Sequence, residues 1–270
     1  MTSNRYVDTV PVPEKVKEKK VIVLSYCRSG TLGLCKALEY LGYTPYNMGQ
    51  ALQNGYPHLK MFHEALQTKR TGQGRPYSRT DFDKWMWNYD ALTIVSCFLS
   101  DEIVQAYPDA KFILTVREPE TWARSVWNTI GLIDVGMQSF PTSFFKYFDK
   151  TDLQFSRLVA LIFDTISRGH GRTGAGFEAA MKVYEEHNAR VKEMLPADRL
   201  LVVKLEDGLG WEQICPFLGV DTPAAPYPRM NDTKQFQANA GNAVQKGKRR
   251  AFKVMVAMAA VAVGLWYVRR

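Results

Sequence analysis

Short aliphatic runs alternate with helical patterns along most of the chain. Four of these runs predict buried strands, at Val21–Ser25, Ala91–Val95, Lys111–Val116 and Leu200–Lys204. The stretches between and after them predict eight helices, at Thr31–Leu41, Pro57–Thr68, Thr80–Trp87, Phe98–Ala106, Pro119–Ile130, Leu153–Ser167, Phe177–Leu195 and Trp211–Phe217. This alternation predicts a three-layer α/β domain around a central parallel sheet, with its binding site at the carboxyl ends of the strands.

Composition separates the chain into four parts. At 270 residues and 46% hydrophobic content, the chain can bury one substantial core. We expect a flexible N-terminal arm over residues 1–20, which hold prolines and a run of Glu and Lys, and one α/β domain over residues 21–240. A basic linker over residues 241–253 and an apolar segment over residues 254–268 follow.

Between residues 131 and 176 the pattern is less regular and rich in aromatic side chains. These are Phe140, Phe144, Phe145, Tyr147, Phe148, Phe155 and Phe163. Two interpretations remain open. The more common one is ordinary helix and core packing, and the other is that the segment lines a hydrophobic substrate cavity.

The stretch Val254–Val268 contains no polar side chain. Counted from Phe252, 17 residues are interrupted only by Lys253, and as a helix they span about 26 Å, the short end of what crosses a bilayer. Basic residues bracket the stretch, and a Trp-Tyr pair lies where interfacial aromatics are found. We therefore expect a C-terminal hydrophobic helix that anchors the protein in a membrane. The alternative is a buried C-terminal helix.

The distribution of charge and the cysteines indicate which partners and which cellular compartment to expect. Residues 245–270 hold seven Lys and Arg and no acid, so removing them from the net charge of +8 leaves +1 for the rest. A broad basic face for nucleic acid is therefore not supported. The four cysteines match neither a disulfide framework nor a metal-ligand pattern, and no signal-peptide core is present. We expect a domain facing the cytosol, without a metal.

The clearest chemical signal follows the first predicted strand. Here Arg28, Ser29, Gly30, Thr31 and Leu32 form a short loop that leads into a helix. The first N–H groups of a helix have no internal partner, and the helix dipole adds positive potential there. A loop of small and hydroxyl residues at that point makes an anion site, to which Arg28 adds a permanent cation. The sequence thus predicts a phosphate-binding (P-loop-type) domain, with arginine where many nucleotide sites have lysine.

A second cluster follows the strand Lys111–Val116. Arg117 comes at its carboxyl end, and Ser125 lies two turns along the next helix. One arginine and one hydroxyl in the crevice can hold a second, separate phosphate by charge-assisted hydrogen bonds. Taken alone, Arg117 is as well explained as a structural ion-pair partner. Its combination with the Arg28 loop favours ligand binding.

These residues carry a resemblance to a known family. The chain resembles the sulfotransferases that use 3′-phosphoadenylyl sulfate (PAPS), in particular a branch that is common in fungi. The resemblance covers about Val21 to Thr233. The matching stretches are Arg28–Thr31, Gly74–Tyr77, Asp81–Asp83, Asn88–Ala91, Ala106–Arg117 with Pro119 and Trp122, Tyr184–Val191, Leu209–Trp211, Phe217–Val220 and Pro226–Thr233.

The resemblance implies roles for the residues that match. The loop from Arg28 to Leu32 would bind the 5′-phosphosulfate, with Arg28 as the catalytic cation, and no metal is required. Arg117 and Ser125, eight residues apart as in that family, would bind the 3′-phosphate. Arg229 would lie in the segment that covers the nucleotide.

One departure from the family concerns the catalytic base. The branch usually has an aspartate after the Tyr-Asp-Ala motif, but this chain has Ile94, which cannot accept a proton. Substitute bases could be Asp101, Glu102, His58 or His63, although sequence alone does not place any of them in the cleft. An acceptor with an acidic phenol needs little help from a base. Leu32 and Gly33 also replace hydroxyl residues that the branch often has.

The sequence leaves three functions to compare. The first is a membrane-anchored, PAPS-dependent sulfotransferase that acts on a hydroxyl of a hydrophobic small molecule, as part of a biosynthetic pathway. The second is a catalytically inactive nucleotide-binding scaffold, which the missing aspartate favours. The third, a kinase or GTPase, lacks the Gly-Lys-Ser/Thr run such sites need.

Ala260 and Gly264 have the spacing of a small-residue pair that can join two tails in a homodimer.

Overall fold

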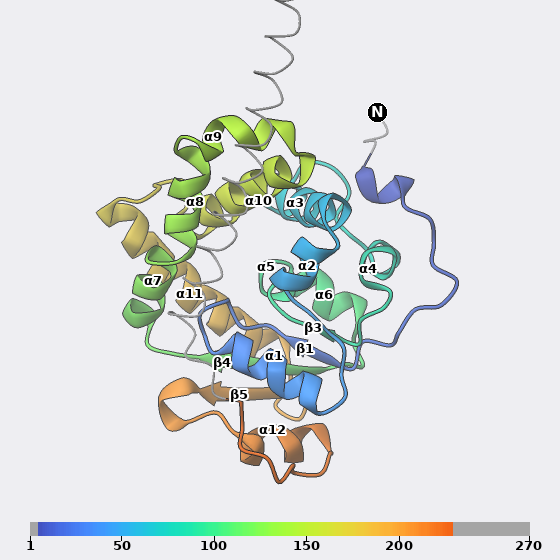
Figure 1. Ribbon diagram of the computed structural model, residues 1–270. Coiled ribbons are helices and arrows are strands. Elements are labelled where there is room, and N and C mark those ends of the chain that lie inside the picture. The colour runs from blue at the N-terminus through green and yellow to red at the C-terminus, as the bar shows by residue number, and fades with distance from the viewer. Residues whose placement is uncertain (1–4, 229–270) are drawn as a thin grey trace, which may run out of the picture.

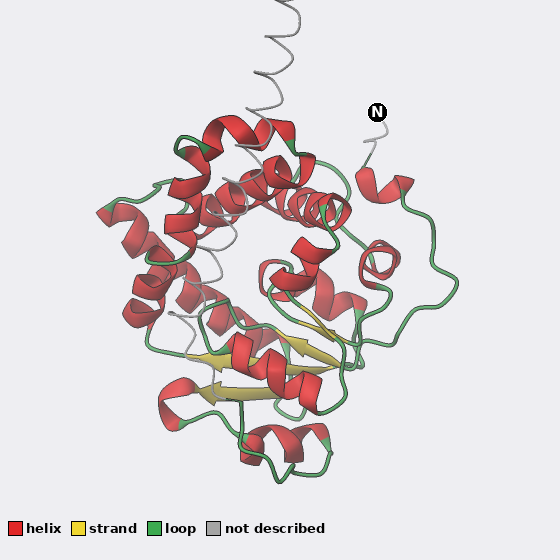
Figure 2. Ribbon diagram, viewed as in Figure 1, coloured by secondary structure: helices red, strands yellow, loops and turns green. Residues whose placement is uncertain are grey.

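The computed structural model describes residues 5–228. Five parallel strands form one sheet in the order β2-β3-β1-β4-β5, and Figure 2 shows them as one layer with helices on both sides. The strands are β1 (Val21–Val23), β2 (Pro45–Tyr46), β3 (Ala91–Leu92), β4 (Lys111–Val116) and β5 (Leu200–Lys204). The predicted three-layer α/β fold with a central parallel sheet is confirmed.

The described residues form twelve α-helices and three short 3₁₀-helices. The α-helices are α1 (Thr31–Tyr40), α2 (Met48–Gln53), α3 (Tyr56–Thr71), α4 (Arg79–Met86), α5 (Val95–Phe98), α6 (Ser100–Ala106), α7 (Pro119–Trp127), α8 (Ile130–Gln138), α9 (Thr142–Phe145), α10 (Lys150–Ile166), α11 (Gly174–Met194) and α12 (Trp211–Leu218). The 3₁₀-helices are η1 (Tyr6–Thr9), η2 (Lys146–Phe148) and η3 (Leu205–Asp207).

The sheet is buried on both faces because successive side chains of each strand point to opposite sides. Val21 and Val23 of β1 pack with residues of α1 and α12, whereas Ile22 joins the larger core on the other face. Figure 1 shows α1 in front of the sheet and α12 below β5. The helices α3 and α10 lie above the sheet, at the end of the molecule away from α12. The uninterrupted aliphatic runs of the sequence are explained by this double burial.

Several element boundaries differ from the sequence-based prediction. β3 ends at Leu92, and the rest of the run predicted as strand turns into α5. Leu99 separates α5 from α6, where one helix was expected. The helix predicted over Pro119–Ile130 ends at Trp127. The strand β2 was not predicted, because its two residues, Pro45 and Tyr46, are too few to give a hydrophobic pattern.

The segment expected to be a loose arm packs on the domain from Arg5 onward. The two Nη nitrogens of Arg5 donate to the two carboxylate oxygens of Asp81, at 2.9 and 3.1 Å, and both side chains are buried. Val7 is fully buried beside them. Asp81 also completes the capping of α4, since its carboxylate accepts from the backbone N–H of Ser78. The cap is therefore Ser78, and α4 begins at Arg79, one residue before the predicted start at Thr80.

The aromatic-rich segment forms α8, α9, η2 and α10. Figure 1 shows these helices at the end of the molecule opposite α12. Lys146 lies buried in this region, where its ammonium group donates to the carbonyl of Met137, to Gln138 and to Ser156. The segment therefore builds a helical layer with polar contacts of its own.

The predicted apolar tail lies outside the described residues. The same is true of the linker that precedes it and of Arg229. None of the helices within residues 5–228 has the length and apolar character that a membrane span requires.

Candidate functional site

The loop after β1 carries two residues with positive φ, Arg28 at 71° and Gly30 at 75°. Gly30 begins α1 in the left-handed conformation that glycine adopts without strain. A Cβ at this position would lie 2.8 Å from Leu205. Close packing and backbone conformation therefore both require the glycine that the sequence places in the loop.

The amino termini of α1 and α7 differ in how they are capped. No described side chain caps α1, so N–H groups of its first turn have no partner within the helix. By contrast, α7 is capped by its own Glu118, whose carboxylate accepts from the N–H groups of Glu120 and Thr121. These N–H groups hold the pKa of Glu118 below its usual range. Of the two helices that follow central strands here, α1 is the one prepared for an anion.

Buried hydrogen bonds fix the shape of the loop. Thr115 of β4 donates its hydroxyl proton to the carbonyl of Ser29, and Trp122 of α7 donates its indole N–H to the carbonyl of Cys27 at 2.9 Å. The hydroxyl group of Ser29 lies 3.2 Å from that of Tyr184 on α11. Three elements thus hold the loop in place before any ligand binds, which reduces the cost of ordering it.

The structure brings the two predicted clusters together. The guanidinium Nε of Arg28 donates to the hydroxyl oxygen of Ser125 at 3.1 Å, and Nη1 of Arg117 donates to the carbonyl oxygen of Arg28 at 2.9 Å. Both contacts join residues about 90 positions apart in the sequence. Arg28, Ser29, Arg117 and Ser125 therefore form one connected group at the carboxyl ends of β1 and β4.

One nitrogen in this group has no partner. Nε of Arg117 is buried and makes no hydrogen bond within the described residues. A buried N–H of a cation without an acceptor is costly, and an anionic oxygen is the partner that would satisfy it. This is a structural reason to place a phosphate beside Arg117, independent of any family pattern.

Tyr184 is the contributor to the site that the sequence did not predict. Its hydroxyl accepts from the backbone N–H of Arg117 at 3.0 Å and contacts Ser29. Its ring is fully buried and stacks on Trp122 with 4.3 Å between ring centroids. It therefore braces both halves of the site. The sequence marked Tyr184 only as the first residue of the matching stretch Tyr184–Val191 and gave it no role, because its role depends on how α11 packs.

The last described residue lies over the start of α1. A Cβ added to Gly33 would lie 2.9 Å from the carbonyl oxygen of Pro228. Gly33 thus makes room for a backbone crossing, which explains a small residue at that position. Arg229, the next residue in the chain, lies outside the described residues, and its predicted role stays a prediction.

The candidate bases named from sequence are all located. Asp101 and Glu102 bind Lys69, and Asp101 also binds Arg190. Burial would raise the pKa of Asp101, but its contacts with Lys69 and Arg190 outweigh that effect and lower it.

The two candidate histidines lie on α3. Nδ1 of His58 is hydrogen-bonded to the hydroxyl group of Tyr46 at 3.0 Å, and burial lowers the pKa of His58 to about 4. Burial also lowers the pKa of His63, and the charges of Lys60 and Arg157 act in the same direction. Both rings are therefore neutral and weakly basic at pH 7.

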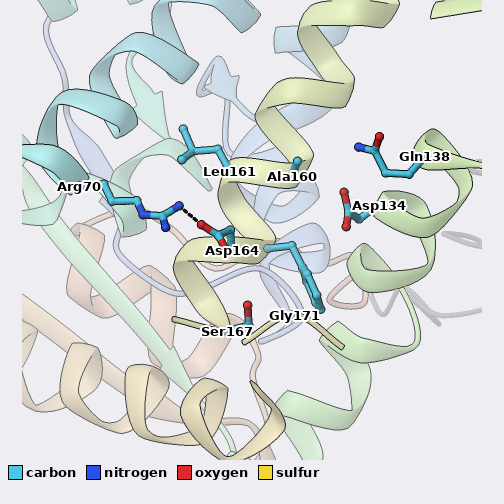
Figure 3. A pocket seen from close by; sticks show the side chains of 9 residues that line it. Arg70, Asp134, Gln138, Ala160, Leu161, Asp164, Ser167 and Gly171 are labelled. Atoms are coloured by element: carbon cyan, nitrogen blue, oxygen red, sulfur yellow. Dashed lines mark ion pairs between the residues drawn. The ribbon is translucent and has the colours of Figure 1, made fainter. Parts of the chain in front are cut away.

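A pocket of about 390 Å³ lies between α3, α8 and α10, as Figure 3 shows. Almost all of its lining residues come from the aromatic-rich segment, but the lining is mixed: Arg70, Asp134, Gln138, Ala160, Leu161, Phe163, Asp164, Ser167 and Gly171. Arg70 and Asp164 form an ion pair across it. The segment therefore does line a cavity, with a far more polar wall than a hydrophobic substrate cavity would have. None of the predicted site residues lines it.

The described residues offer no metal site. Within residues 5–228, no group of three or more His, Cys, Asp or Glu lies close enough together to hold a metal ion. None of the four cysteines forms a disulfide within the described residues.

Fold and site together define a class of protein: an α/β domain with a glycine-containing loop between β1 and α1 and a second arginine at the end of the neighbouring strand β4. Comparison with known proteins identifies the family. The model of the sulfotransferase domain family matches residues 20–236. The chain belongs to this family and is an enzyme that transfers sulfuryl groups.

The chain is also similar to individual known proteins. Ava biosynthesis cluster protein M of Aspergillus versicolor is 30% identical over 264 residues, which cover 93% of this chain and 96% of that protein. Among solved structures, a sulfotransferase from Alicyclobacillus acidocaldarius is 12% identical, with a TM-score of 0.44 over 86% of this chain and 93% of that one. The sulfotransferase STF1 of Mycobacterium tuberculosis is 13% identical, with a TM-score of 0.35 over 91% and 78%.

Proposed function

We propose that the protein transfers a sulfuryl group from PAPS to a hydroxyl of a hydrophobic small molecule. The observation that carries the proposal is the pairing of two anion sites at one edge of the sheet: the uncapped amino terminus of α1 and the unpartnered Nε of Arg117. PAPS is an adenosine with a phosphosulfate at one end of its ribose and a phosphate at the other, so it needs two such sites.

The residues divide between the two ends of the nucleotide. Arg28, Ser29, Gly30, Thr31 and Leu32 would bind the 5′-phosphosulfate, and Arg117 with Ser125 would bind the 3′-phosphate. Arg28 and Ser125 contact each other directly in the structure, which brings the residues for both ends of the nucleotide into one group. We expect Arg229 to cover the nucleotide from the segment that follows Pro228.

The chemistry requires in-line attack on sulfur and stabilisation of charge on the bridging oxygen. Arg28 and the N–H groups at the start of α1 supply positive potential at that point. Their positions are fixed beforehand by Thr115, Trp122 and Tyr184. No metal is needed for this role.

The acceptor is proposed to be a hydrophobic small molecule in a biosynthetic pathway. The name of the relative from Aspergillus versicolor, a biosynthesis cluster protein, supports this setting. Sulfation there would serve either as a final modification or to create a leaving group for a later step. We also propose that the apolar segment 254–268 tethers the domain to a membrane, facing the cytosol.

Isothermal titration calorimetry of an Arg117→Ala variant tests the two-ended site. We expect the variant to bind adenosine 3′,5′-bisphosphate about 1.5–3 kcal/mol more weakly, the range for hydrogen bonds to charged groups. Binding of adenosine 5′-phosphosulfate, which lacks the 3′-phosphate, should change much less.

Arg124→Ala is the matched control, because Arg124 lies on α7 but is exposed and paired with Glu120. It should leave both affinities unchanged. Equal losses for both nucleotides in the Arg117 variant would show that Arg117 does not bind the 3′-phosphate.

A further inference from the structure

The turn after β3 is built around Ile94. The N–H of Val95 donates to the carbonyl of Thr93 at 2.7 Å, which closes a γ-turn with Ile94 at its centre, at φ 68° and ψ −54°. This conformation is rare and strained, above all for a β-branched residue. Strain of this kind persists where the surrounding structure imposes it, often at a functional site.

The turn lies beside the phosphate-binding loop. Ser96, two residues after Ile94, donates to the carbonyl of Val23 in β1. Phe98 of α5 packs against Tyr26 of the loop, with 5.2 Å between ring centroids. Among residues 91–100, Ile94 is the one whose side chain is not buried. It therefore lies partly exposed just after the carboxyl end of β3, the strand next to β1.

The polar groups around this turn are donors to backbone carbonyls. Thr93 donates to the carbonyl of Tyr46 at 2.9 Å, and the thiol of Cys97 donates to the carbonyl of Ile94 itself. Ser96 is held by Val23, as described above. Burial raises the pKa of the Cys97 thiol well above its usual range. Neutral alcohols and thiols bind protons only weakly, and the raised pKa keeps Cys97 in its thiol form, so none of these side chains is suited to act as a base.

The titratable groups on the neighbouring helices are also engaged. On α11, Nε2 of His187 donates to the carbonyl of Leu24 at 2.7 Å, and burial lowers the pKa of this ring. On α3, His58 is bound to Tyr46 and has a pKa of about 4. On α6, Asp101 binds two cations. Burial raises the pKa of Tyr26 above its usual range. The loop adds Arg28, a cation.

We propose that the acceptor is a hydroxyl acidic enough to lose its own proton, such as a phenol or an enol, and that Ile94 excludes unactivated alcohols from productive turnover. This proposal rests on the proposed sulfotransferase function and adds the acceptor class. The site offers positive potential from Arg28 and α1 but, within the described residues around the turn, no carboxylate without a cationic partner, and burial lowers the pKa of His58 and His187, which makes both rings weak bases. It is therefore suited to an acceptor that arrives as an anion.

The reaction balances without a base. The phenol releases its proton to solvent and binds as phenolate. Its oxygen attacks sulfur, the new S–O bond forms, and the bond from sulfur to the bridging phosphate oxygen breaks. That oxygen keeps the electron pair, and adenosine 3′,5′-bisphosphate leaves. Arg28 stabilises the charge at both stages.

The first test follows rate against pH for phenols of different acidity. With 4-nitrophenol, 4-cyanophenol and unsubstituted phenol, kcat/KM should rise about tenfold per pH unit until the pKa of each phenol is reached. The inflection should therefore move with the acceptor. A single inflection shared by all three would show that a group on the enzyme accepts the proton, and would overturn the proposal.

The second test supplies the missing base. In Ile94→Asp, turnover of a matched aliphatic alcohol, such as 2-phenylethanol, should rise by about 10²-fold over the wild type. Ile94→Asn has the same shape but cannot accept a proton, and it should show no such gain. Calorimetry with adenosine 3′,5′-bisphosphate confirms that each variant is folded.

The outcomes separate this proposal from the function on which it rests. Efficient turnover of 2-phenylethanol by the wild type, or a folded Ile94→Asp with no gain, overturns the acceptor assignment and leaves the sulfotransferase function intact. Nucleotide binding without turnover of any phenol or alcohol removes both, and indicates a binding scaffold.

Discussion

At the residue scale, backbone strain marks the candidate site. Three non-glycine residues among those described have positive φ: Arg28, Ile94 and Arg168. Two of them follow adjacent central strands, at the edge where the proposed nucleotide and acceptor meet. Such strain costs about 1–3 kcal/mol for each residue, so the rest of the fold must offset it. At Ile94 this cost can be measured, because substitutions can separate the contribution of the side chain to stability from that of the backbone conformation.

Ile94→Gly and Ile94→Ala separate the two contributions. Both remove most of the side chain, but only glycine adopts positive φ without strain. Alanine normally stabilises a fold relative to glycine because it restricts the unfolded chain. At position 94 we expect the opposite order, with the glycine variant about 1–2 kcal/mol more stable. Urea unfolding of both variants measures this difference. The usual order, with alanine more stable, would mean that Ile94 is not strained.

At the element scale, the sequence predicted residues whose position follows from neighbouring residues, and it missed contacts between distant parts of the chain. Arg28, Ser29, Arg117 and Ser125 were predicted because each follows a strand directly or by helical spacing. Tyr184 was not, since α11 reaches the loop only through packing across 155 residues. The strand β2 was missed because two residues give no hydrophobic pattern. Likewise, the arm docks through Arg5 and Asp81, which are 76 residues apart.

The pair of Arg5 and Asp81 predicts a measurable loss when it is broken. Asp81→Asn keeps the shape of the side chain but leaves the buried guanidinium group of Arg5 with only the partly exposed Asp8 as a counter-charge. We expect stability at pH 7 to fall by about 3 kcal/mol. Lys36→Gln, which breaks an exposed pair with Glu39, should cost less than about 1 kcal/mol.

The same pair sets a pH dependence. Burial would raise the pKa of Asp81, but hydrogen bonds from Arg5 and Ser78 outweigh it and lower the pKa in the folded state. The unfolded state therefore takes up a proton first as the pH falls. The contribution of Asp81 is fully present above the ordinary aspartate pKa of about 4 and is lost below it. Denaturant unfolding between pH 7 and pH 3 should show this decline in the wild type and a smaller one in Asp81→Asn.

At the scale of the whole molecule, the charge is unevenly distributed. Residues before 245 carry a net charge of +1, and the other seven net positive charges lie in residues 245–270, which contain the apolar segment 254–268. A nearly neutral domain has little attraction of its own for an anionic membrane. We therefore propose that the tail, rather than the domain, brings this enzyme to a membrane.

Truncation after Asn242 separates membrane attachment from nucleotide binding. The full chain should cosediment with liposomes of neutral lipid when it is synthesised in their presence, because the apolar segment inserts and its flanking cations stay at the interface. The truncated chain should remain in the supernatant. It should still bind adenosine 3′,5′-bisphosphate, since every described site residue precedes position 229. Cosedimentation of the truncated chain would refute the tail anchor and place the membrane contact on the domain instead.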